Sequence, residues 1–466
     1  MSQAPRWPAN VLPTGRVVGL GETARGIGRS LGIRGASWLD PIRQGTLFWV
    51  ATQIILVLFT WVTVVLFVPL AIRTLKTAPP YFFVGGWGYW DGIHYRTIAW
   101  EGFSRADLTA FYPLYPLLVR AFGAVVMLFY HPSDPLVWVE MWGGLFASHL
   151  SALVAFIAVA ALARRELGSQ EGAWRALVVT ATYPFAFFLA TIYPQATLLA
   201  AVTLTLFWAR SGRWLAASGA ACAAALTHQA GVALALPLAW EFARQHGWLP
   251  LEVVRDALGE RFRLSRLPGA VGAGAQEALH RSLGGGRRVT DLAKGLLVVA
   301  SAPFGLVLYM AYLWHAFGNP LIYQQVQRLP QWDRHPTAPW TTAHLYWEYL
   351  GRVGHWGYGE TLMLVDGALW VGLAILTILL ARRQPFMFTL WVGCLLLFCV
   401  ISPTYSVSIA DPISGTGRFL TAATPLFVAL AGAFRTRPAL GVAWVGGGMM
   451  LQSIFAGLFL IGRFVG

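Results

Sequence analysis

Charged residues are scarce in this sequence. Asp, Glu, Lys and Arg make up 12% of the 466 residues, whereas hydrophobic residues make up 57%, and the mean hydropathy is +0.58. A soluble domain carries about a quarter charged residues, so the composition excludes an ordinary soluble protein. The apolar residues form uninterrupted runs near helix length, whereas a β-barrel would show short alternating segments. The sequence therefore predicts an all-α, polytopic membrane protein.

Cysteine is also scarce. The three cysteines, Cys222, Cys394 and Cys399, all fall within apolar runs. They form neither a disulfide framework nor a CxxC metal motif, and small buried side chains are the simplest interpretation. The GAVGAG stretch in segment 244–294 lacks the flanking strand and helix of a dinucleotide site. No cofactor and no metal site is predicted, and a requirement for a divalent metal stays open.

About eleven apolar runs are predicted to be membrane-spanning helices of one domain, residues 47–466. A polar, basic segment, residues 1–46, precedes the first run, which starts too late and is too long for a signal peptide. The predicted spans lie near residues 47–70, 137–163, 173–191, 193–209, 213–227, 231–243, 292–316, 361–381, 385–402, 418–434 and 438–460.

The net charge of +14 is explained by its distribution along the chain. With a cytoplasmic N-terminus, the predicted inner segments hold most of the 34 Lys and Arg, including the basic cytoplasmic loop 244–294, while the 20 acids divide evenly between the two sides. This positive-inside pattern predicts that loops 71–136 and 317–360 lie on the outer side of an inner or plasma membrane. Contact with anionic membrane lipid accounts for the charge without a nucleic-acid partner.

The segment 111–130 is apolar enough to span a membrane. Counting it as a span would move the basic segment 164–175 to the outer side and reverse every later loop. We therefore predict a juxtamembrane or re-entrant helix at the outer face, with Pro113 and Pro116 at its irregular entry.

Asp91 is the strongest candidate for a catalytic residue in the first outer loop. It follows Trp90 in an aromatic-rich stretch, and a partly desolvated carboxylate is suited to act as a general base. His94, Tyr95 and Ile98 follow at i+3, i+4 and i+7, so a helix would place them on the same face as Asp91. The alternative is an interfacial helix for which Asp91 is an ordinary N-terminal cap.

Two motifs in this loop can be compared with known families. They read Trp90-Asp91-x-x-x-Tyr95-x-x-Ile98-Ala99-x-x-Gly102-Phe103 and Ala110-Phe111-Tyr112-Pro113-Leu114-Tyr115-Pro116. Both resemble the signature of the PIG-V-like mannosyltransferases, and segments 186–200, 318–340 and 414–427 are similar to later parts of that family in the same order. The sequence departs from the family pattern at Tyr193-Pro194-Gln195-Ala196, at Thr227-His228 and at Asn319.

The resemblance implies an integral-membrane glycosyltransferase of the C type. The family includes the enzyme that adds the second mannose of GPI anchors, and its members take mannose from a polyprenyl-phosphate-mannose donor on the outer or lumenal face. For this chain it implies inverting transfer to a lipid-linked or cell-envelope glycan acceptor. Such a reaction needs a base for the acceptor proton and positive charge or oriented N–H groups for the leaving phosphate.

Candidate site residues follow from these needs. Asp91 is the predicted base, and Arg418, just outside a predicted span, is the first candidate for binding phosphate, before Arg334 and His335. An interfacial anchor is the alternative for Arg418, and a solvated pair is the alternative for the other two. We expect Asp91, Arg418 and loop 328–340 to share one outer cavity. Candidates for binding the rest of the substrate are Trp90, Tyr95, Tyr112, Tyr115, Gln195, His228 and Gln327.

Several alternatives stay open at this point. His228, between two short apolar runs, either binds substrate or makes an interhelical hydrogen bond. Glu101 and Asp107 are a second acid or metal ligands, or solvated loop charges. A lipid-linked sugar transporter would show internal repeats and mid-membrane charges, which are not evident in the sequence. A non-catalytic membrane subunit is the third class, because segments 193–196 and 227–228 depart from the family pattern.

Overall fold

The computed structural model describes residues 39–72, 83–133, 135–249, 285–352, 357–405 and 411–465. Over these residues the chain is helical without a β-strand, and Arg334 and Thr404 form an isolated antiparallel bridge. The predicted all-α class is therefore confirmed for the described residues. Residues 1–40 form a unit of their own, and most of the predicted segment 1–46 lies outside the described residues. The features below belong to the unit formed by residues 41–466.

Among the described residues, five helices are long and apolar enough to cross a membrane. They are α2 (Leu39–Ile72), α6 (Pro135–Leu167), α13 (Gly285–Phe317), α16 (Tyr358–Leu380) and α20 (Pro438–Leu460). A sixth span is possible if a pair bent by 74° counts as one, namely α18 (Thr416–Phe419) with η7 (Leu420–Ala422) and α19 (Thr424–Phe434). Because a bilayer core is crossed by about 20 apolar residues in a helix, these elements support an integral membrane protein.

The predicted number of about eleven membrane-spanning helices is not confirmed. The remaining predicted spans form shorter helices, which are α7 (Gln170–Ala181), α8 (Gln195–Arg210), α9 (Trp214–Thr227), α10 (Ala235–Gln245) and α17 (Phe386–Val400). The run 173–191 shows the physical reason. Its α-helix ends at Ala181, because Pro184 follows and cannot continue the helical hydrogen bonds, and the chain then turns into η3 (Ala186–Leu189).

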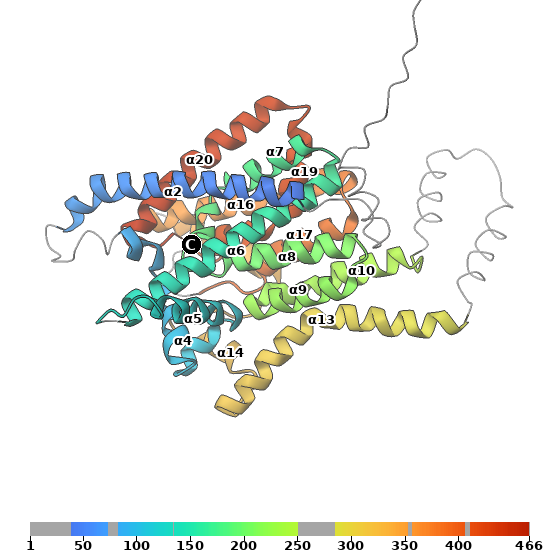
Figure 1. Cartoon of the computed structure of the whole chain (residues 1–466), viewed down its shortest axis with the longest axis horizontal. Coiled ribbons are helices and arrows are strands. Elements are labelled where there is room, and N and C mark those ends of the chain that lie inside the picture. Colours follow the sequence, from blue (N-terminus) through green and yellow to red (C-terminus); the bar gives the residue numbers. More distant parts are fainter. Residues whose placement is uncertain are drawn as a thin grey trace, which may run out of the picture. The chain divides into compact units, whose positions relative to one another are not determined.

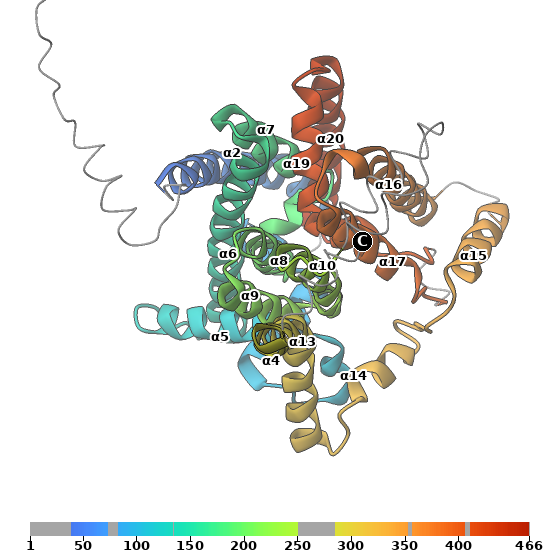
Figure 2. The same cartoon turned by 90° about the vertical axis from the view of Figure 1, so that its right-hand side faces the viewer.

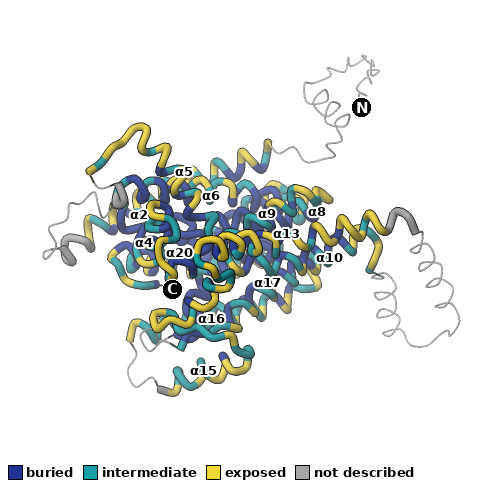
Figure 3. The backbone as a smooth tube through the Cα atoms, turned by 90° about the horizontal axis from the view of Figure 1, so that it is seen from below, coloured by how far each residue is buried: buried dark blue, intermediate teal, exposed yellow. Residues whose placement is uncertain are grey.

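Helices at the centre and at the edge of this unit differ in burial. The apolar stretch of α6 is 67% buried, whereas those of α2 and α20 are 11% and 22% buried. The central helices α6, α8, α9, α10 and α19 lie side by side in Figure 2, and Figure 3 shows the buried backbone concentrated at this centre. Apolar helices that stay exposed are what a lipid environment allows, because lipid does not penalise their surface.

An ion cluster fixes one end of the buried helix α8. Arg210, in its last turn, places its Nε 3.0 Å from Oε1 of Glu166 on α6 and its Nη1 3.2 Å from Oε1 of Glu241 on α10. Glu241 is fully buried and also pairs with Arg244 at 2.6 Å. Charged groups that are buried must be paired, so this cluster holds α6, α8 and α10 in a defined register. Gln195 begins the opposite end of α8, at the cavity described below.

Short helices build the two predicted outer loops. The first loop contains η1 (Gly86–Gly88), α4 (Asp91–Glu101), η2 (Ala106–Ala110) and α5 (Leu114–Met127), and the second contains α14 (Ile322–Gln325), η5 (Val326–Arg328) and α15 (Pro339–Arg352). Helix α5 packs against α4 and α6 (Figure 1). Its 14 residues reach about 21 Å, short of the hydrocarbon core of about 30 Å, which fits the predicted juxtamembrane helix.

The predicted orientation in the membrane stays a prediction. The basic loop predicted at 244–294 lies largely outside the described residues, between α10 and α13. Helix α13 carries Pro303 in its interior and is bent in Figure 1, as an interior proline requires. Its C-terminal half carries Tyr309 into the neighbourhood of the cavity.

Candidate active site

One cavity of about 770 Å³ collects most of the predicted site residues. Its volume falls within the range of ligand sites in proteins. The predicted residues among those that line it are Trp90, Asp91, Tyr95, Tyr112, Gln195, His228, Gln327, Arg328, Arg334 and Arg418. The expectation that Asp91, Arg418 and loop 328–340 share one cavity is therefore met by the geometry, although these residues come from distant parts of the chain.

Asp91 and Arg418 are in direct contact. Nη1 of Arg418 donates to Oδ2 of Asp91 at 2.6 Å, and the side chains are only 12% and 23% exposed. The Arg418 guanidinium also lies over two aromatic rings, with its carbon 5.6 Å from the centre of Tyr193 and 5.2 Å from that of Phe419. A charge-assisted hydrogen bond and cation–π contacts together hold this guanidinium at the cavity wall.

Helix α4 presents Asp91 from its first turn. The helix dipole favours a negative side chain at this end. The backbone N–H of Asp91 donates to the hydroxyl of Tyr193 at 3.1 Å, and that hydroxyl donates to the carbonyl of Tyr89 at 3.3 Å. Tyr193, which is not among the predicted site residues, thus ties the start of α4 to the segment before α8.

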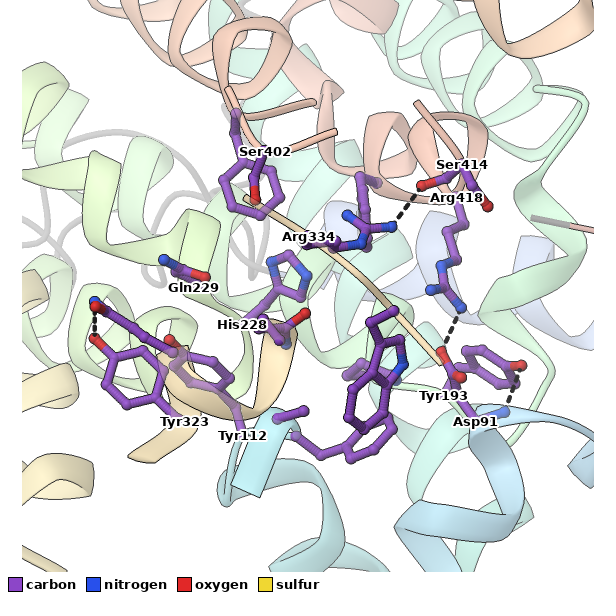
Figure 4. Close-up of a pocket in the computed structure, with 18 of the residues that line it drawn as sticks. Asp91, Tyr112, Tyr193, His228, Gln229, Tyr323, Arg334, Ser402, Ser414 and Arg418 are labelled. Atoms are coloured by element: carbon purple, nitrogen blue, oxygen red, sulfur yellow. Dashed lines mark hydrogen bonds and ion pairs between the residues drawn. The ribbon is translucent and has the colours of Figure 1, made fainter. Parts of the chain in front are cut away.

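Arg334 supplies a second guanidinium close to the first. Its Nη2 donates to the carbonyl of Ser414 at 3.0 Å, and Figure 4 shows it between His228 and Arg418. Burial and the neighbouring Arg418 lower the pKa of Arg334 to about 10, so it remains charged at neutral pH. We call Asp91, Arg334 and Arg418 the charged end of the cavity. It carries one negative and two positive side chains, and an anion would neutralise the excess.

Two strained backbone positions flank the charged end. Among the described residues, the non-glycine residues with positive φ are Trp90 (φ 57°) and Asp333 (φ 42°). Trp90 directly precedes Asp91, and Asp333 directly precedes Arg334. Such backbone angles are uncommon for non-glycine residues, more so for Trp than for Asp, and the strain costs about 1–3 kcal/mol. Strain of this kind concentrates at functional sites, where the surrounding structure enforces it.

Uncharged polar and aromatic side chains line the cavity away from Asp91, and Arg328 is a further lining residue. We call Tyr112, His228, Gln229 and Tyr323 the aromatic end; Figure 4 shows it across the cavity from Asp91 and Arg418. Nδ1 of His228 accepts from the backbone N–H of Ala230 at 3.2 Å, so the neutral ring carries its proton on Nε2. Burial, with Arg418 and Arg334 as further causes, lowers the pKa of His228 to about 3. His228 is therefore an uncharged hydrogen-bond donor.

Three buried polar atoms on lining residues have no hydrogen-bond partner among the residues that the structure describes. They are Nε of Arg418, Oε1 of Gln195 and the hydroxyl of Tyr112. Gln195 is 3% exposed and Tyr112 is 5% exposed. Leaving such an atom unpaired costs about 1–3 kcal/mol, so a ligand that offers hydrogen bonds to these atoms would recover that cost.

Other predicted site residues do not line the cavity. Nε2 of His335 lies 2.8 Å from Oδ1 of Asp333. The hydroxyl of Tyr115, fully buried, lies 2.6 Å from that of Ser148. Asp107 pairs with the exposed Arg105 at 3.2 Å.

Glu101 accepts from Ser104 at the surface and does not line the cavity either. No group of three or more His, Cys, Asp and Glu side chains placed to hold a metal ion occurs in the described ranges.

A pair of buried carboxyl groups, not predicted from the sequence, lies behind the arginines. Oδ1 of Asp366 accepts from the backbone N–H of Gly417 at 2.9 Å, and Oδ1 of Asp411 accepts from that of Ile413 at 3.0 Å. Burial raises the pKa of Asp411 to about 6. Together they brace the turn that carries Ser414 and Arg418. An acid within the apolar run 361–381 is the signal that could have identified Asp366.

Comparisons with known proteins add solved structures of low similarity. No protein family and no curated protein matches this sequence, so the resemblance to the PIG-V-like mannosyltransferases stays a prediction. The oligosaccharyltransferase of Archaeoglobus fulgidus in its apo form is similar with 14% identity and a TM-score of 0.39, over 90% of this chain and 56% of that chain.

A second solved structure is the archaeal oligosaccharyltransferase AglB from the same organism, in complex with an inhibitory peptide and a dolichol-phosphate. It is similar with 14% identity and a TM-score of 0.33, over 81% of this chain and 51% of that chain. This chain thus spans about half the length of the structures it matches.

Proposed function

We propose that this protein is an integral-membrane glycosyltransferase. It transfers a sugar from a polyprenyl-phosphate donor to a lipid-linked or cell-envelope acceptor, and the sequence motifs favour mannose as the sugar. The observation that carries the proposal is the charged end of the cavity, where a carboxylate and two guanidiniums from three distant segments meet. This combination offers a base and an anion site within one space.

The proposed reaction is a single displacement with inversion. Asp91 takes the proton of the acceptor hydroxyl while that oxygen forms a bond to the anomeric carbon. The bond from the anomeric carbon to the phosphate oxygen breaks, and its electron pair leaves with the polyprenyl phosphate. Arg334 and Arg418 stabilise the negative charge on the departing phosphate.

The pairing of Asp91 with Arg418 gives this reaction an order. A donor phosphate competes with the Asp91 carboxylate for the Arg418 guanidinium, because both are anions seeking the same N–H groups. Donor binding therefore releases a carboxylate oxygen of Asp91 for the acceptor hydroxyl. The base becomes available only when the leaving group is in place.

The test is sugar transfer by the purified full-length chain in lipid vesicles with radiolabelled polyprenyl-phosphate-mannose and an envelope lipid extract as acceptor. We expect label to move into the extract, and Asp91→Asn to slow this transfer by at least about a hundred-fold. Transport of the intact donor across the vesicle membrane without transfer would instead identify a sugar-lipid transporter. If neither transfer nor transport is observed, the remaining interpretation is a non-catalytic membrane subunit.

The proposal also requires the cavity to face the non-cytoplasmic side. A cysteine introduced at Ala343, an exposed position of α15, should react with an impermeant maleimide added to intact cells. A cysteine at Ala275, in the basic segment, should not react until the cells are opened. The opposite pattern would reverse the orientation and contradict an outer active site.

A further inference from the structure

The aromatic end has the chemistry of a site for an uncharged hydroxylated ring. Its four members are Tyr112, His228, Gln229 and Tyr323, which offer hydroxyl, imidazole N–H and amide groups without a charge. Burial raises the pKa of Tyr112 well above its ordinary value, so its hydroxyl stays protonated and both donates and accepts. Sugar hydroxyls also donate and accept, and uncharged groups of this kind are their natural partners.

Aromatic rings surround these polar groups. The ring centre of Tyr112 lies 6.1 Å from that of Tyr323 and 6.5 Å from that of His228. The apolar face of a sugar ring packs against such surfaces while its hydroxyls reach the polar edges.

Tyr112 has a close structural counterpart in Tyr309 of α13. The two rings pack with centres 5.3 Å apart in one buried cluster. The Tyr309 hydroxyl donates to the carbonyls of Thr109 and Phe111, at 2.9 and 3.0 Å. The Tyr112 hydroxyl has no partner among the described residues. Of two adjacent buried tyrosines, one hydroxyl therefore holds two backbone carbonyls of the fold, and the other is buried beside the cavity without a partner among the described residues.

We propose that the aromatic end is a subsite for an uncharged sugar ring, with the Tyr112 hydroxyl and Nε2–H of His228 as hydrogen-bonding groups. This subsite deepens the proposed glycosyltransferase function and rests on it for the identity of the ligand. The sugar is either that of the donor or that of a glycan acceptor, since both present the same hydroxyl chemistry. The charged end binds the phosphate, and the aromatic end adds recognition of the sugar.

The test compares Tyr112→Phe with Tyr309→Phe in the full-length chain, reconstituted in lipid nanodiscs. Three probes are titrated: a polyprenyl phosphate, the corresponding polyprenyl-phosphate-mannose, and an alkyl mannoside that lacks phosphate. Thermal unfolding of each variant is recorded without probe. Tyr323→Phe serves as a second variant, because Tyr323 lines the cavity and its hydroxyl accepts from Nε2 of Gln324, its neighbour in the sequence.

We expect Tyr112→Phe to lower the affinity for a sugar-bearing probe by about 3- to 10-fold, which is the contribution of one hydrogen bond. The affinity for polyprenyl phosphate should be unchanged. Its thermal stability should equal or exceed that of the wild type, since no hydrogen bond of the fold is lost. Tyr309→Phe should lower stability, because two backbone carbonyls lose their donor. Weakened binding of the phosphate-linked sugar alone assigns the subsite to the donor, and weakened binding of the alkyl mannoside assigns it to a glycan acceptor.

Unchanged affinity of Tyr112→Phe and Tyr323→Phe for both sugar-bearing probes would overturn the subsite. An equal loss of affinity for polyprenyl phosphate and for the sugar-bearing probes would overturn it as well. A loss of stability in Tyr112→Phe as large as in Tyr309→Phe would show a structural role instead. A wild type that binds the alkyl mannoside but not polyprenyl phosphate would contradict the proposed donor and keep the sugar subsite. A wild type that binds no probe would reject both proposals.

Discussion

The two ends of the cavity are built on different principles. At the charged end, Asp91 pairs with Arg418, and Arg334 is held by the carbonyl of Ser414. At the aromatic end, the Tyr112 hydroxyl has no partner within the described part of the chain, and His228 is neutral. A buried charge must be paired or it destabilises the fold, whereas an unpaired hydroxyl costs about 1–3 kcal/mol. The charges of the charged end are therefore organised by contacts within the protein, although Nε of Arg418 is unpaired there, and the aromatic end keeps the unpaired hydroxyl of Tyr112 beside the cavity.

The largest expected effect is at the charged end, for Asp91→Asn. Transfer should fall by about a hundred- to ten-thousand-fold, the usual worth of a general base, while the affinity for polyprenyl phosphate should not fall, because Arg418 is released. Radiolabel transfer and binding measure the two quantities. Asp107→Asn, an acid of the same loop outside the cavity, is the control. An Asp91→Asn enzyme within a factor of about three of wild type would reject Asp91 as the base, since general-base help is worth far more.

Arg418→Gln should have the next largest effect. We expect about a 10- to 100-fold loss of polyprenyl phosphate affinity, the worth of a hydrogen bond to a charged group. The variant also leaves the Asp91 carboxylate partly buried and unpaired, so its melting temperature should fall. The double variant with Asp91→Asn should recover part of that temperature. Arg105→Gln at an exposed pair serves as control, and phosphate affinity equal to wild type in Arg418→Gln would remove this residue from the site.

Gln195→Met tests whether unpaired polar atoms mark ligand contacts outside the aromatic end as well. We expect about a 3- to 10-fold weaker binding of polyprenyl-phosphate-mannose, with no loss of thermal stability. The matched control is Gln245→Met, because Gln245 donates to Ala209 and Glu241 at 2.8 Å, and its loss should lower stability. A destabilised Gln195→Met variant with unchanged affinity would assign Gln195 to the fold.

The smallest effect concerns pH, at the carboxyl pair behind the charged end. Burial raises the pKa of Asp411 from 3.8 to about 6, so the folded state binds a proton that the unfolded state releases. The contribution of Asp411 to the free energy of unfolding is full below pH 3.8 and is lost as the pH rises to about 6. Its neighbours there are Asp366 and Arg334.

His228 acts in the opposite direction over this range, because its pKa is lowered in the folded state. The measurement is therefore the difference in melting temperature between Asp411→Asn and wild type across pH 4 to 7. The melting temperature of the variant should rise relative to that of the wild type as the pH rises, by a few degrees at most. A difference that is constant with pH would show that Asp411 does not titrate in the folded protein.

Much of the helical architecture could be predicted from the sequence, but not the number of spans. The long apolar runs at 47–70 and 438–460 became α2 and α20, because twenty apolar residues leave few alternatives to a helix. The run 418–434 became a pair bent by 74°. Hydropathy averages over such a break, and only the packing around it reveals where the helix turns.

The candidate residues show the same division. Asp91 can be singled out from its aromatic surroundings, and the spacing of His94, Tyr95 and Ile98 after it is compatible with the helix that begins there. His335 is predicted from the same loop as Arg334, yet its side chain contacts Asp333, with Nε2 2.8 Å from Oδ1. Neighbouring residues in an irregular loop point in directions that composition does not specify.

What the sequence by itself determined is the class of protein and the types of residue available. The deficit of charge and the apolar runs required helices in lipid, and the motif around Asp91 pointed to a carboxylate on α4. Only the tertiary structure decided which residues meet. Asp91 and Arg418 lie 327 positions apart and touch at 2.6 Å, and adjacent tyrosines differ in whether the backbone satisfies their hydroxyls. The physical reason is that pairing and burial depend on distances across the chain, which local patterns do not encode.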